Sequence, residues 1–245
     1  MVPLVLLPAF PLDAQMYRGV VGHMAADVVT PDLPGFGGTA KPQTHPSIDV
    51  YADAVAAELD SLGLGSIALG GTSMGGYVAM AFCRRYAERV AGLALIDTKA
   101  TADSPAAAAG RRAMAEEMEQ GQTTQPLIDS VLPKLLGETT VRDRPEVTEL
   151  VRGWVLDAPA ASAAWAQRAM ADRPDSFDTL RQVGVPSLVV VGAEDVLAPP
   201  PDAEAMALAL NDVEVKVLAG AGHLTPVEAP LSVAQLLDAF LLRIG

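Results

Sequence analysis

The amino-acid sequence predicts an α/β fold built on a mostly parallel sheet, with a helical insert near its middle. Short apolar segments alternate with helix-like segments at both ends of the 245-residue chain. Between these two regions, residues 98–174 contain no strand-like run. We therefore expect a core formed by residues 1–97 and 175–245, and a helical cap of residues 98–174 inserted into it.

Six segments are expected to form the sheet, because each is short, mostly apolar and followed within two residues by Pro, Gly or Asp. They are residues 2–7, 27–30, 66–69, 90–96, 186–191 and 214–218. Helices of the core are expected over residues 48–62, 77–86, 202–210 and 227–244. Helices of the cap, several with Pro in the first turn, are expected over residues 105–120, 126–136, 146–157 and 159–171.

The composition excludes several classes of protein. Half of the residues are hydrophobic and 19% are charged, which excludes intrinsic disorder. The formal net charge of −13 disfavours partners such as nucleic acid or an anionic membrane. The single Cys83 permits no internal disulfide, no apolar run reaches the roughly 18 residues of a membrane span, and the N-terminal apolar run has no basic segment before it. We expect a cytoplasmic protein.

The motif Gly71-Thr72-Ser73-Met74-Gly75 is the main indicator of chemistry. It follows a short apolar strand and precedes a helix, which is the setting of a nucleophile elbow. A sharp turn there exposes the serine hydroxyl, and the flanking glycines avoid clashes that side chains would cause. The N-terminus of the following helix adds partial positive charge where an oxyanion would form. We therefore predict that Ser73 is a nucleophile, in preference to an ordinary residue of a glycine-rich loop.

A serine nucleophile needs a base, and an acid that orients the base. Among the three histidines, His223 lies in a glycine-rich loop after the last expected strand, whereas His23 and His45 are expected at the surface. Asp195 also follows a strand, and catalytic residues of parallel sheets collect at the carboxyl ends of the strands. Asp97 ends a strand too and is the competing acid, although a supporting role is the expectation for it. His223 and Asp195 are thus predicted to complete the triad.

These motifs resemble those of the α/β-hydrolase superfamily, and the resemblance covers nearly the whole chain. The order Ser73, Asp195, His223 matches its triad, and the segment Asp32-Leu33-Pro34-Gly35-Phe36-Gly37 is similar to its D-x-P-G-x-G loop. Within the superfamily, the chain looks most like small bacterial carboxylesterases and enol-lactonase-like serine hydrolases. The resemblance implies an α/β-hydrolase fold, with about six strands instead of eight because no counterpart of the leading β-hairpin is seen.

The resemblance also implies an oxyanion hole formed by the backbone N–H groups of Phe10 and Met74. The family usually has His-Gly before the first of these residues, whereas this chain has Pro8-Ala9. One such donor can contribute about 2.7–4 kcal/mol to transition-state stabilisation. The departure therefore concerns catalytic efficiency more than the type of reaction.

The sequence thus predicts hydrolysis of a small, neutral carboxylic ester or lactone through an acyl-enzyme, with no metal or organic cofactor. Residues beside the triad loops or in the cap are the candidates for substrate binding: Leu12, Leu197, Leu224, Trp154 and Trp165. For the two tryptophans, packing of the cap against the core is an equal alternative. Arg111, Arg112 and Arg152 are candidates for binding an acidic substrate, although solvated helix faces are the commoner role of such residues.

Other activities stay open on the same fold. They are perhydrolase or cofactor-free haloperoxidase activity, C–C bond hydrolysis, and ligand binding with slow turnover. A haloalkane dehalogenase is disfavoured, because Ser73 stands where that enzyme requires an aspartate nucleophile.

Overall fold

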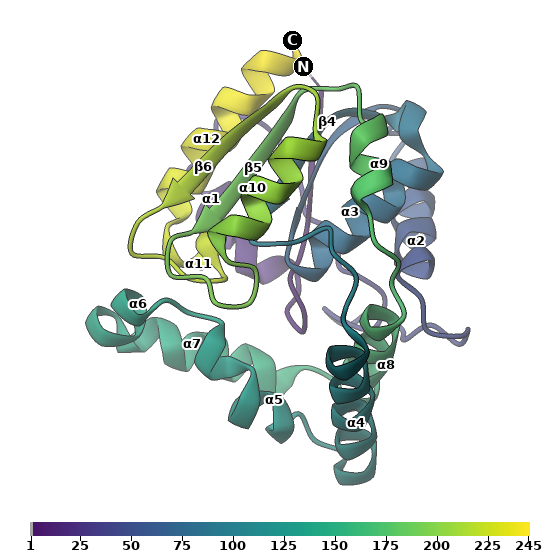
Figure 1. The fold of residues 1–245 in the computed structure, drawn as a ribbon, viewed down its shortest axis with the longest axis vertical. Coiled ribbons are helices and arrows are strands. Elements are labelled where there is room, and N and C mark those ends of the chain that lie inside the picture. The colour runs from purple at the N-terminus through teal and green to yellow at the C-terminus, as the bar shows by residue number, and fades with distance from the viewer. Residues whose placement is uncertain (1) are drawn as a thin grey trace.

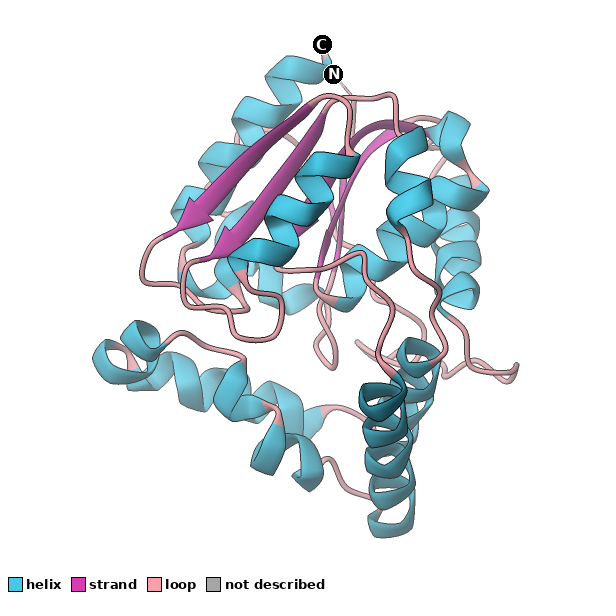
Figure 2. Ribbon diagram, viewed as in Figure 1, coloured by secondary structure: helices cyan, strands magenta, loops and turns pink. Residues whose placement is uncertain are grey.

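Six parallel strands form the central sheet in residues 2–245, the part of the chain that the computed structural model describes (Figures 1 and 2). Along the sheet the order is β2-β1-β3-β4-β5-β6, and every neighbouring pair is parallel. The strands are β1 (Leu4–Leu7), β2 (Val28–Val29), β3 (Ile67–Thr72), β4 (Val90–Ile96), β5 (Ser187–Gly192) and β6 (Val213–Leu218). The predicted α/β fold with about six mostly parallel strands is therefore confirmed.

The strand order reverses direction at β1, which has β2 on one side and β3 on the other. In open parallel sheets, a crevice forms at such a point beyond the carboxyl ends of the strands. These ends face the helical insert, residues 98–174, in Figure 1. The topology thus places the loops after β1, β3, β5 and β6 between the sheet and the insert.

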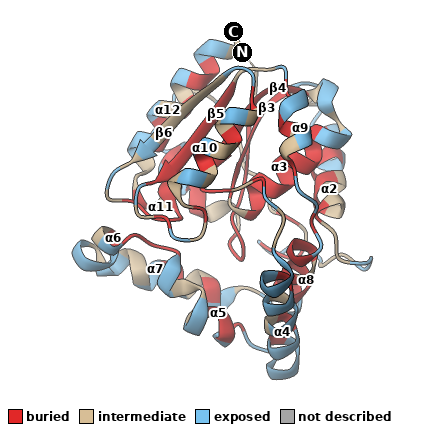
Figure 3. Ribbon diagram, viewed as in Figure 1, coloured by how far each residue is buried: buried red, intermediate tan, exposed pale blue. Residues whose placement is uncertain are grey.

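Helices cover both faces of the sheet (Figure 1). One face carries α1 (Arg18–Val21) and α12 (Pro230–Ile244), and the other carries α2 (Ile48–Ser61), α3 (Met74–Arg85), α9 (Phe177–Gln182) and α10 (Pro200–Ala209). Short 3₁₀ turns precede α1 and β4, at Ala14–Tyr17 and Ala87–Arg89. The strands β1, β3 and β5 are buried throughout, because helices pack on both faces of the sheet. Figure 3 shows this burial for β5.

The insert is wholly helical where it forms regular structure. It contains α4 (Pro105–Gly121), α5 (Gln125–Ser130), the 3₁₀ turn Leu132–Lys134, α6 (Glu138–Asp143), α7 (Pro145–Asp157) and α8 (Ala160–Ala171). Helices α4 and α8 pack along each other, away from the line formed by α5, α6 and α7 (Figure 1). The side chain of Ser104 caps α4 by accepting a hydrogen bond from the amide of Ala107 (3.2 Å).

Several element boundaries differ from the prediction. The expected final helix is divided into α11 (Thr225–Glu228) and α12, because Pro230 lacks an N–H group and the preceding Ala229 leaves the helical conformation. Helices α6 and α9 were not predicted, and each spans only six residues. Such short helices carry too little periodicity to be recognised in a sequence.

The helices of the described chain are too short or too polar for any of them to span a lipid bilayer.

Candidate active site

Ser73 occupies the sharp turn between β3 and α3. Its backbone has φ of 53° and ψ of −113°, a strained conformation for a residue with a side chain. The Ser73 amide donates to the Ile96 carbonyl (2.9 Å), and the Thr98 hydroxyl donates to the Ser73 carbonyl (2.8 Å). The chain at and just after the end of β4 thus holds the turn in place, and the expected strand–turn–helix setting of Ser73 is present.

The glycines on either side of Ser73 sit where no side chain fits. A Cβ atom on Gly71 would lie 2.2 Å from the carbonyl oxygen of Gly75. A Cβ atom on Gly75 would lie 2.1 Å from the carbonyl oxygen of Leu7. Both distances are far shorter than van der Waals contact, so both positions require glycine. The close approach brings the loop after β1 against the first turn of α3.

Ser73, His223 and Asp195 form a continuous chain of hydrogen bonds. Oγ of Ser73 lies 2.8 Å from Nε2 of His223, and Nδ1 of His223 lies 2.8 Å from Oδ2 of Asp195. The side chains of His223 and Asp195 are only 5% and 0% exposed. Their burial strengthens the hydrogen bond between them, because water does not compete for it.

The surroundings of Asp195 keep its carboxylate ionised. Oδ1 accepts hydrogen bonds from the amides of Leu197 (2.8 Å) and Ala198 (3.0 Å). Burial acts to raise the pKa of Asp195, but the hydrogen bond and charge of His223, together with these two amides, bring the pKa below its ordinary value. An ionised carboxylate at this point can stabilise an imidazolium on His223.

Asp97, the competing acid, makes its hydrogen bonds elsewhere. Its Oδ1 accepts from the Gly192 amide (3.1 Å), and its Oδ2 accepts from the amide and hydroxyl of Thr225 (2.8 and 2.7 Å). Gly192 lies just before Asp195 in the chain, and Thr225 just after His223, so Asp97 ties the two loops together. Complete burial raises the pKa of Asp97 to about 7, although His223 acts to lower it.

The backbone N–H groups of Phe10 and Met74 come from the loop after β1 and from the start of α3. Within residues 2–245, neither N–H donates to a protein acceptor. In the loop, the Ala9 amide donates to Sδ of Met16 (3.2 Å), and the Ala9 carbonyl accepts from the Leu12 amide (2.7 Å). The loop that replaces the usual His-Gly is therefore held by its own hydrogen bonds.

Two glutamates join the insert to the loops after β5 and β6. Glu194 accepts hydrogen bonds from the amide and hydroxyl of Thr139 (2.8 and 2.6 Å). Glu228 accepts from the amide of Gly137 in the insert (2.8 Å) and from the amide of Gly222 in the β6 loop (2.9 Å). The start of α6 is thus fixed to both loops that complete the chain of hydrogen bonds.

A cavity of about 130 Å³ lies beside Ser73 and His223. The core contributes Phe10, Tyr77 and Leu197 to its wall, and the insert contributes Lys99, Arg111, Val131, Leu135, Gln167 and Met170. Ligand pockets are commonly larger, about 300–1,000 Å³, so this one suits a short ligand.

Of the three leucines expected to bind substrate, Leu197 lines the cavity, whereas Leu12 and Leu224 do not. They are buried in the core, 2% and 0% exposed. Closeness in sequence to the loops of the site placed them in the expected pocket, yet both side chains are enclosed by the core instead. Of the three arginines considered for an acidic substrate, only Arg111 lines the cavity.

The two tryptophans do not line the cavity either. The ring of Trp165 packs edge-on against Tyr51, with 5.0 Å between ring centroids, and its N–H donates to the Thr44 carbonyl (3.1 Å). Trp154 is partly buried against the hydrophobic core. For Trp165 this is packing of the insert against the core, the alternative stated for both residues; the helix of Trp154, α7, packs on α5, α6 and the 3₁₀ turn of the insert itself.

Tyr77, Lys99 and Gln167 line the cavity but were not among the predicted residues. Tyr77 stands one helical turn after Ser73, a spacing that could have indicated it. Lys99 follows the end of β4 by three residues, and Gln167 lies in the middle of α8. Neither position carries a sequence signal, because both depend on how the insert folds back over the sheet.

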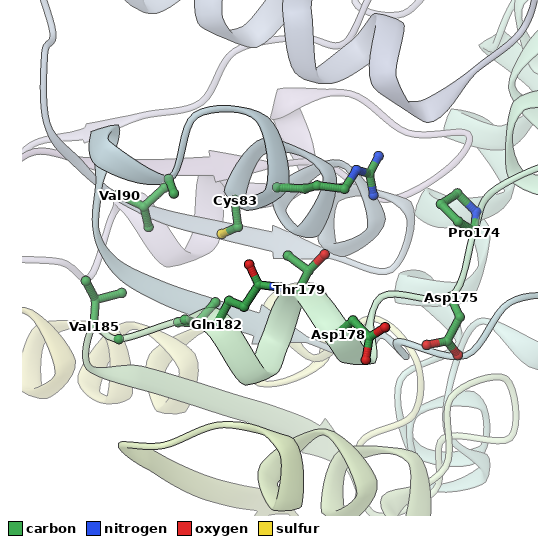
Figure 4. A pocket seen from close by; sticks show the side chains of 12 residues that line it. Cys83, Val90, Pro174, Asp175, Asp178, Thr179, Gln182 and Val185 are labelled. Atoms are coloured by element: carbon green, nitrogen blue, oxygen red, sulfur yellow. The ribbon is translucent and has the colours of Figure 1, made fainter.

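A larger cavity, of about 440 Å³, lies between α3 and α9 and includes none of these residues (Figure 4). Cys83, Asp175 and Gln182 are among its lining residues. Burial raises the pKa of the Cys83 thiol to about 12, so this thiol is a poor nucleophile. We therefore place the candidate active site at the smaller cavity.

Comparison with known proteins identifies the family. Residues 2–230 match the alpha/beta hydrolase fold, and the chain belongs to this family. The chain superposes on a thermophilic esterase from Thermogutta terrifontis, solved with malate bound, with a TM-score of 0.95 and 40% identity, covering 100% of this chain and 90% of that one. It superposes on an enol-lactonase from Burkholderia xenovorans with a TM-score of 0.89 and 24% identity, covering 99% and 92%.

Relatives found by sequence differ in their chemistry. The chain is 29% identical to a pimeloyl-[acyl-carrier protein] methyl ester esterase from Aromatoleum aromaticum, over 96% of both chains. It is also 29% identical to the dihydrolipoyllysine-residue acetyltransferase component of an acetoin cleaving system from Pseudomonas putida, of which it spans 63% while 98% of this chain is matched. The protein is thus an α/β-fold hydrolase with esterases among its relatives.

Proposed function

We propose that the protein is a serine hydrolase that cleaves a small carboxylic ester or lactone through an acyl-enzyme. The observation that carries this proposal is the chain of two 2.8 Å hydrogen bonds from Ser73 through His223 to Asp195. It ends at a serine hydroxyl in the wall of a cavity. The esterases among the relatives support the same reaction.

The proposed reaction has two stages. His223 takes the Ser73 proton through Nε2 while Oγ attacks the carbonyl carbon, and Asp195 stabilises the resulting imidazolium. The imidazolium then protonates the leaving alkoxide, which gives an acyl-enzyme on Ser73. A water molecule, deprotonated by His223, attacks this ester, and the acid leaves as the serine regains its proton.

In each stage, negative charge develops on the carbonyl oxygen of the substrate. We propose that the N–H groups of Phe10 and Met74 bind this oxygen, since no protein acceptor in the described chain engages them. The N-terminus of α3 adds favourable electrostatic potential, because α3 begins at Met74.

We propose a cytoplasmic location and a small-molecule substrate, without a nucleic-acid partner. The net charge of −13 supports the absence of a polyanionic partner. The single cysteine is buried and unpaired, which is consistent with a reducing compartment.

Turnover of short p-nitrophenyl esters by the parent protein and by Ser73→Ala tests the proposed reaction. We expect hydrolysis by the parent and a fall of about three orders of magnitude or more in the variant. Turnover that is undiminished in Ser73→Ala would refute the assignment of Ser73. No turnover of any ester or lactone by the parent would favour the ligand-binding alternative.

A further inference from the structure

The wall of the cavity beside Ser73 carries positive charge in a strongly acidic protein. Lys99 and Arg111 both line it, whereas no aspartate or glutamate does so within the described residues. The whole chain has a formal net charge of −13. A cavity whose charge opposes that of the molecule indicates selection for an anionic ligand.

Lys99 has hydrogen-bonding capacity left for a ligand. Its Nζ donates to the Leu197 carbonyl (3.2 Å), in the loop that follows Asp195. An ammonium group has three donors, so two remain. Lys99 takes part in none of the ion pairs formed within residues 2–245. Its charge is therefore uncompensated by a direct ion pair.

Arg111 is held in place by hydrogen bonds to two neighbouring side chains. Its Nε donates to Asp103, and its Nη1 donates to Oε1 of the buried Gln167 (2.9 Å). Two contacts leave three of the five guanidinium donors unused by them. A guanidinium fixed in this way loses little side-chain entropy when its remaining donors bind a ligand.

Asp103 does not neutralise this side of the cavity, because it is shared between two arginines. It pairs with Arg111 and also with the buried Arg173, whose Nη1 lies 2.9 Å from Oδ1. Arg173 in turn stacks over the ring of Tyr77, which lines the cavity, with 4.0 Å from Cζ to the ring centroid. One carboxylate between two guanidiniums leaves a net positive charge.

We infer that Lys99 and Arg111 form a carboxylate-binding subsite, so that the preferred substrate is a short ester or lactone that also carries a free carboxylate. The fork of a guanidinium matches the two oxygens of a carboxylate, and an ammonium adds a second charge. The small cavity limits the distance between the carboxylate and the scissile carbonyl. This inference rests on the proposed function and replaces the neutral substrate expected from the sequence.

Monomethyl esters of succinate, glutarate and adipate test the subsite. Each is compared with a neutral isostere in which an isopropyl group replaces the carboxylate, by following methanol release. We expect the best carboxylate ester to exceed its isostere in kcat/KM by about tenfold or more, the effect of one charge-assisted contact. Lys99→Met and Arg111→Met should each reduce this ratio, and the double variant should bring it near one.

Arg112→Met is the matched control, because Arg112 is the next residue of α4 but pairs with Asp172 outside the cavity. It should keep the parental ratio. Inhibition of neutral-ester hydrolysis by free glutarate, stronger in the parent than in Lys99→Met, gives a second readout if Arg111→Met folds poorly. The subsite would be overturned if the parent hydrolysed the carboxylate ester and its isostere equally well. It would also be overturned if the ratio of their kcat/KM values were unchanged in the double variant. Loss of Ser73 dependence would overturn the proposed function instead.

Discussion

Asp195 and Asp97 are two buried aspartates near one histidine, and their contacts assign them different tasks. Only Asp195 reaches the imidazole, at 2.8 Å from Nδ1. Asp97 instead accepts three hydrogen bonds from Gly192 and Thr225. From the sequence, both residues follow strands, and Asp195 is the predicted member of the triad while Asp97 is the competitor with an expected supporting role. The hydrogen-bond partners of the two carboxylates distinguish their tasks.

Substitution by asparagine distinguishes the two aspartates. Asp195→Asn should lower kcat by about four orders of magnitude, since the amide no longer stabilises the imidazolium or its productive tautomer. Asp97→Asn should lower kcat by less than about tenfold and cost about 1–3 kcal/mol of unfolding free energy, because one acceptor oxygen is lost. Steady-state kinetics and urea denaturation measure both effects. An inactive Asp97→Asn beside an active Asp195→Asn would reverse the assignment.

The pKa of Asp97, raised by burial to about 7, makes its contribution to stability dependent on pH. An aspartate of the unfolded chain has a pKa of about 3.9, so between these values the folded state holds a proton that the unfolded state releases. The stability contributed by Asp97 is full below about pH 4 and is lost as the pH rises through about 7.

We therefore expect the unfolding free energy of the parent, relative to Asp97→Asn, to fall as the pH rises from about 5 to 7. The slope should reach at most about 1.4 kcal/mol per pH unit, the effect of one proton. Urea denaturation of both proteins at each pH gives the difference between their unfolding free energies. Taking this difference cancels the contributions of titratable groups that the two proteins share. A difference that stays constant with pH would show that Asp97 has no raised pKa.

At the scale of elements, the junction between β1, β3 and α3 fixes the nucleophile. Gly71 and Gly75 allow these elements to approach more closely than any side chain would permit. The motif therefore indicates the geometry of the turn as well as its chemistry. This is why the elbow could be predicted from sequence, whereas the position of the insert could not.

Gly75→Ala tests this junction. The added Cβ would meet the backbone of β1, so we expect a loss of about 3 kcal/mol or more of unfolding free energy, at the upper end of the cost of overpacking. Gly110→Ala is the control: a Cβ on this exposed glycine of α4 meets no atom of residues 2–245 within 4 Å. It should stabilise the protein by up to about 1 kcal/mol. Thermal denaturation measures the stability of both variants. A Gly75→Ala variant as stable as the parent would contradict the close approach of β1 and α3.

The contact between Glu194 and α6 attaches the insert to the core. Glu194→Ala removes the acceptor of the Thr139 amide and hydroxyl. We expect amides at the start of α6 to exchange hydrogen about fivefold faster, corresponding to about 1 kcal/mol. Hydrogen exchange followed by mass spectrometry measures this, with Glu149→Ala on the exposed surface of α7 as the control. Unchanged exchange in α6 would mean that other contacts hold the insert.

At the scale of the whole molecule, periodicity and turn residues predicted the sheet because strands and crossover helices are local patterns. The three residues of the hydrogen-bonded chain could be found because each follows a strand, and parallel strands bring their ends together. The cavity could not be derived in this way. Arg111 and Gln167 come together because α4 and α8 pack against each other, and they join Lys99 in the cavity wall only through tertiary contacts of the insert.

The same limit explains why Leu12, Leu224 and the tryptophans were expected in the pocket. Sequence proximity to a functional loop gives the position of the backbone but not the direction of the side chain. The net charge of −13 also concealed the cationic wall, since a sum over the chain contains no information on where the charges lie.

The central claim is that Ser73 is the nucleophile, and covalent labelling tests it most directly. The parent protein is incubated with a fluorophosphonate probe, digested and examined by peptide mass spectrometry. We expect one probe per chain, attached to the peptide that contains Ser73, and no labelling of Ser73→Ala. A probe attached to another residue of the parent, or equal labelling of Ser73→Ala, would contradict the account.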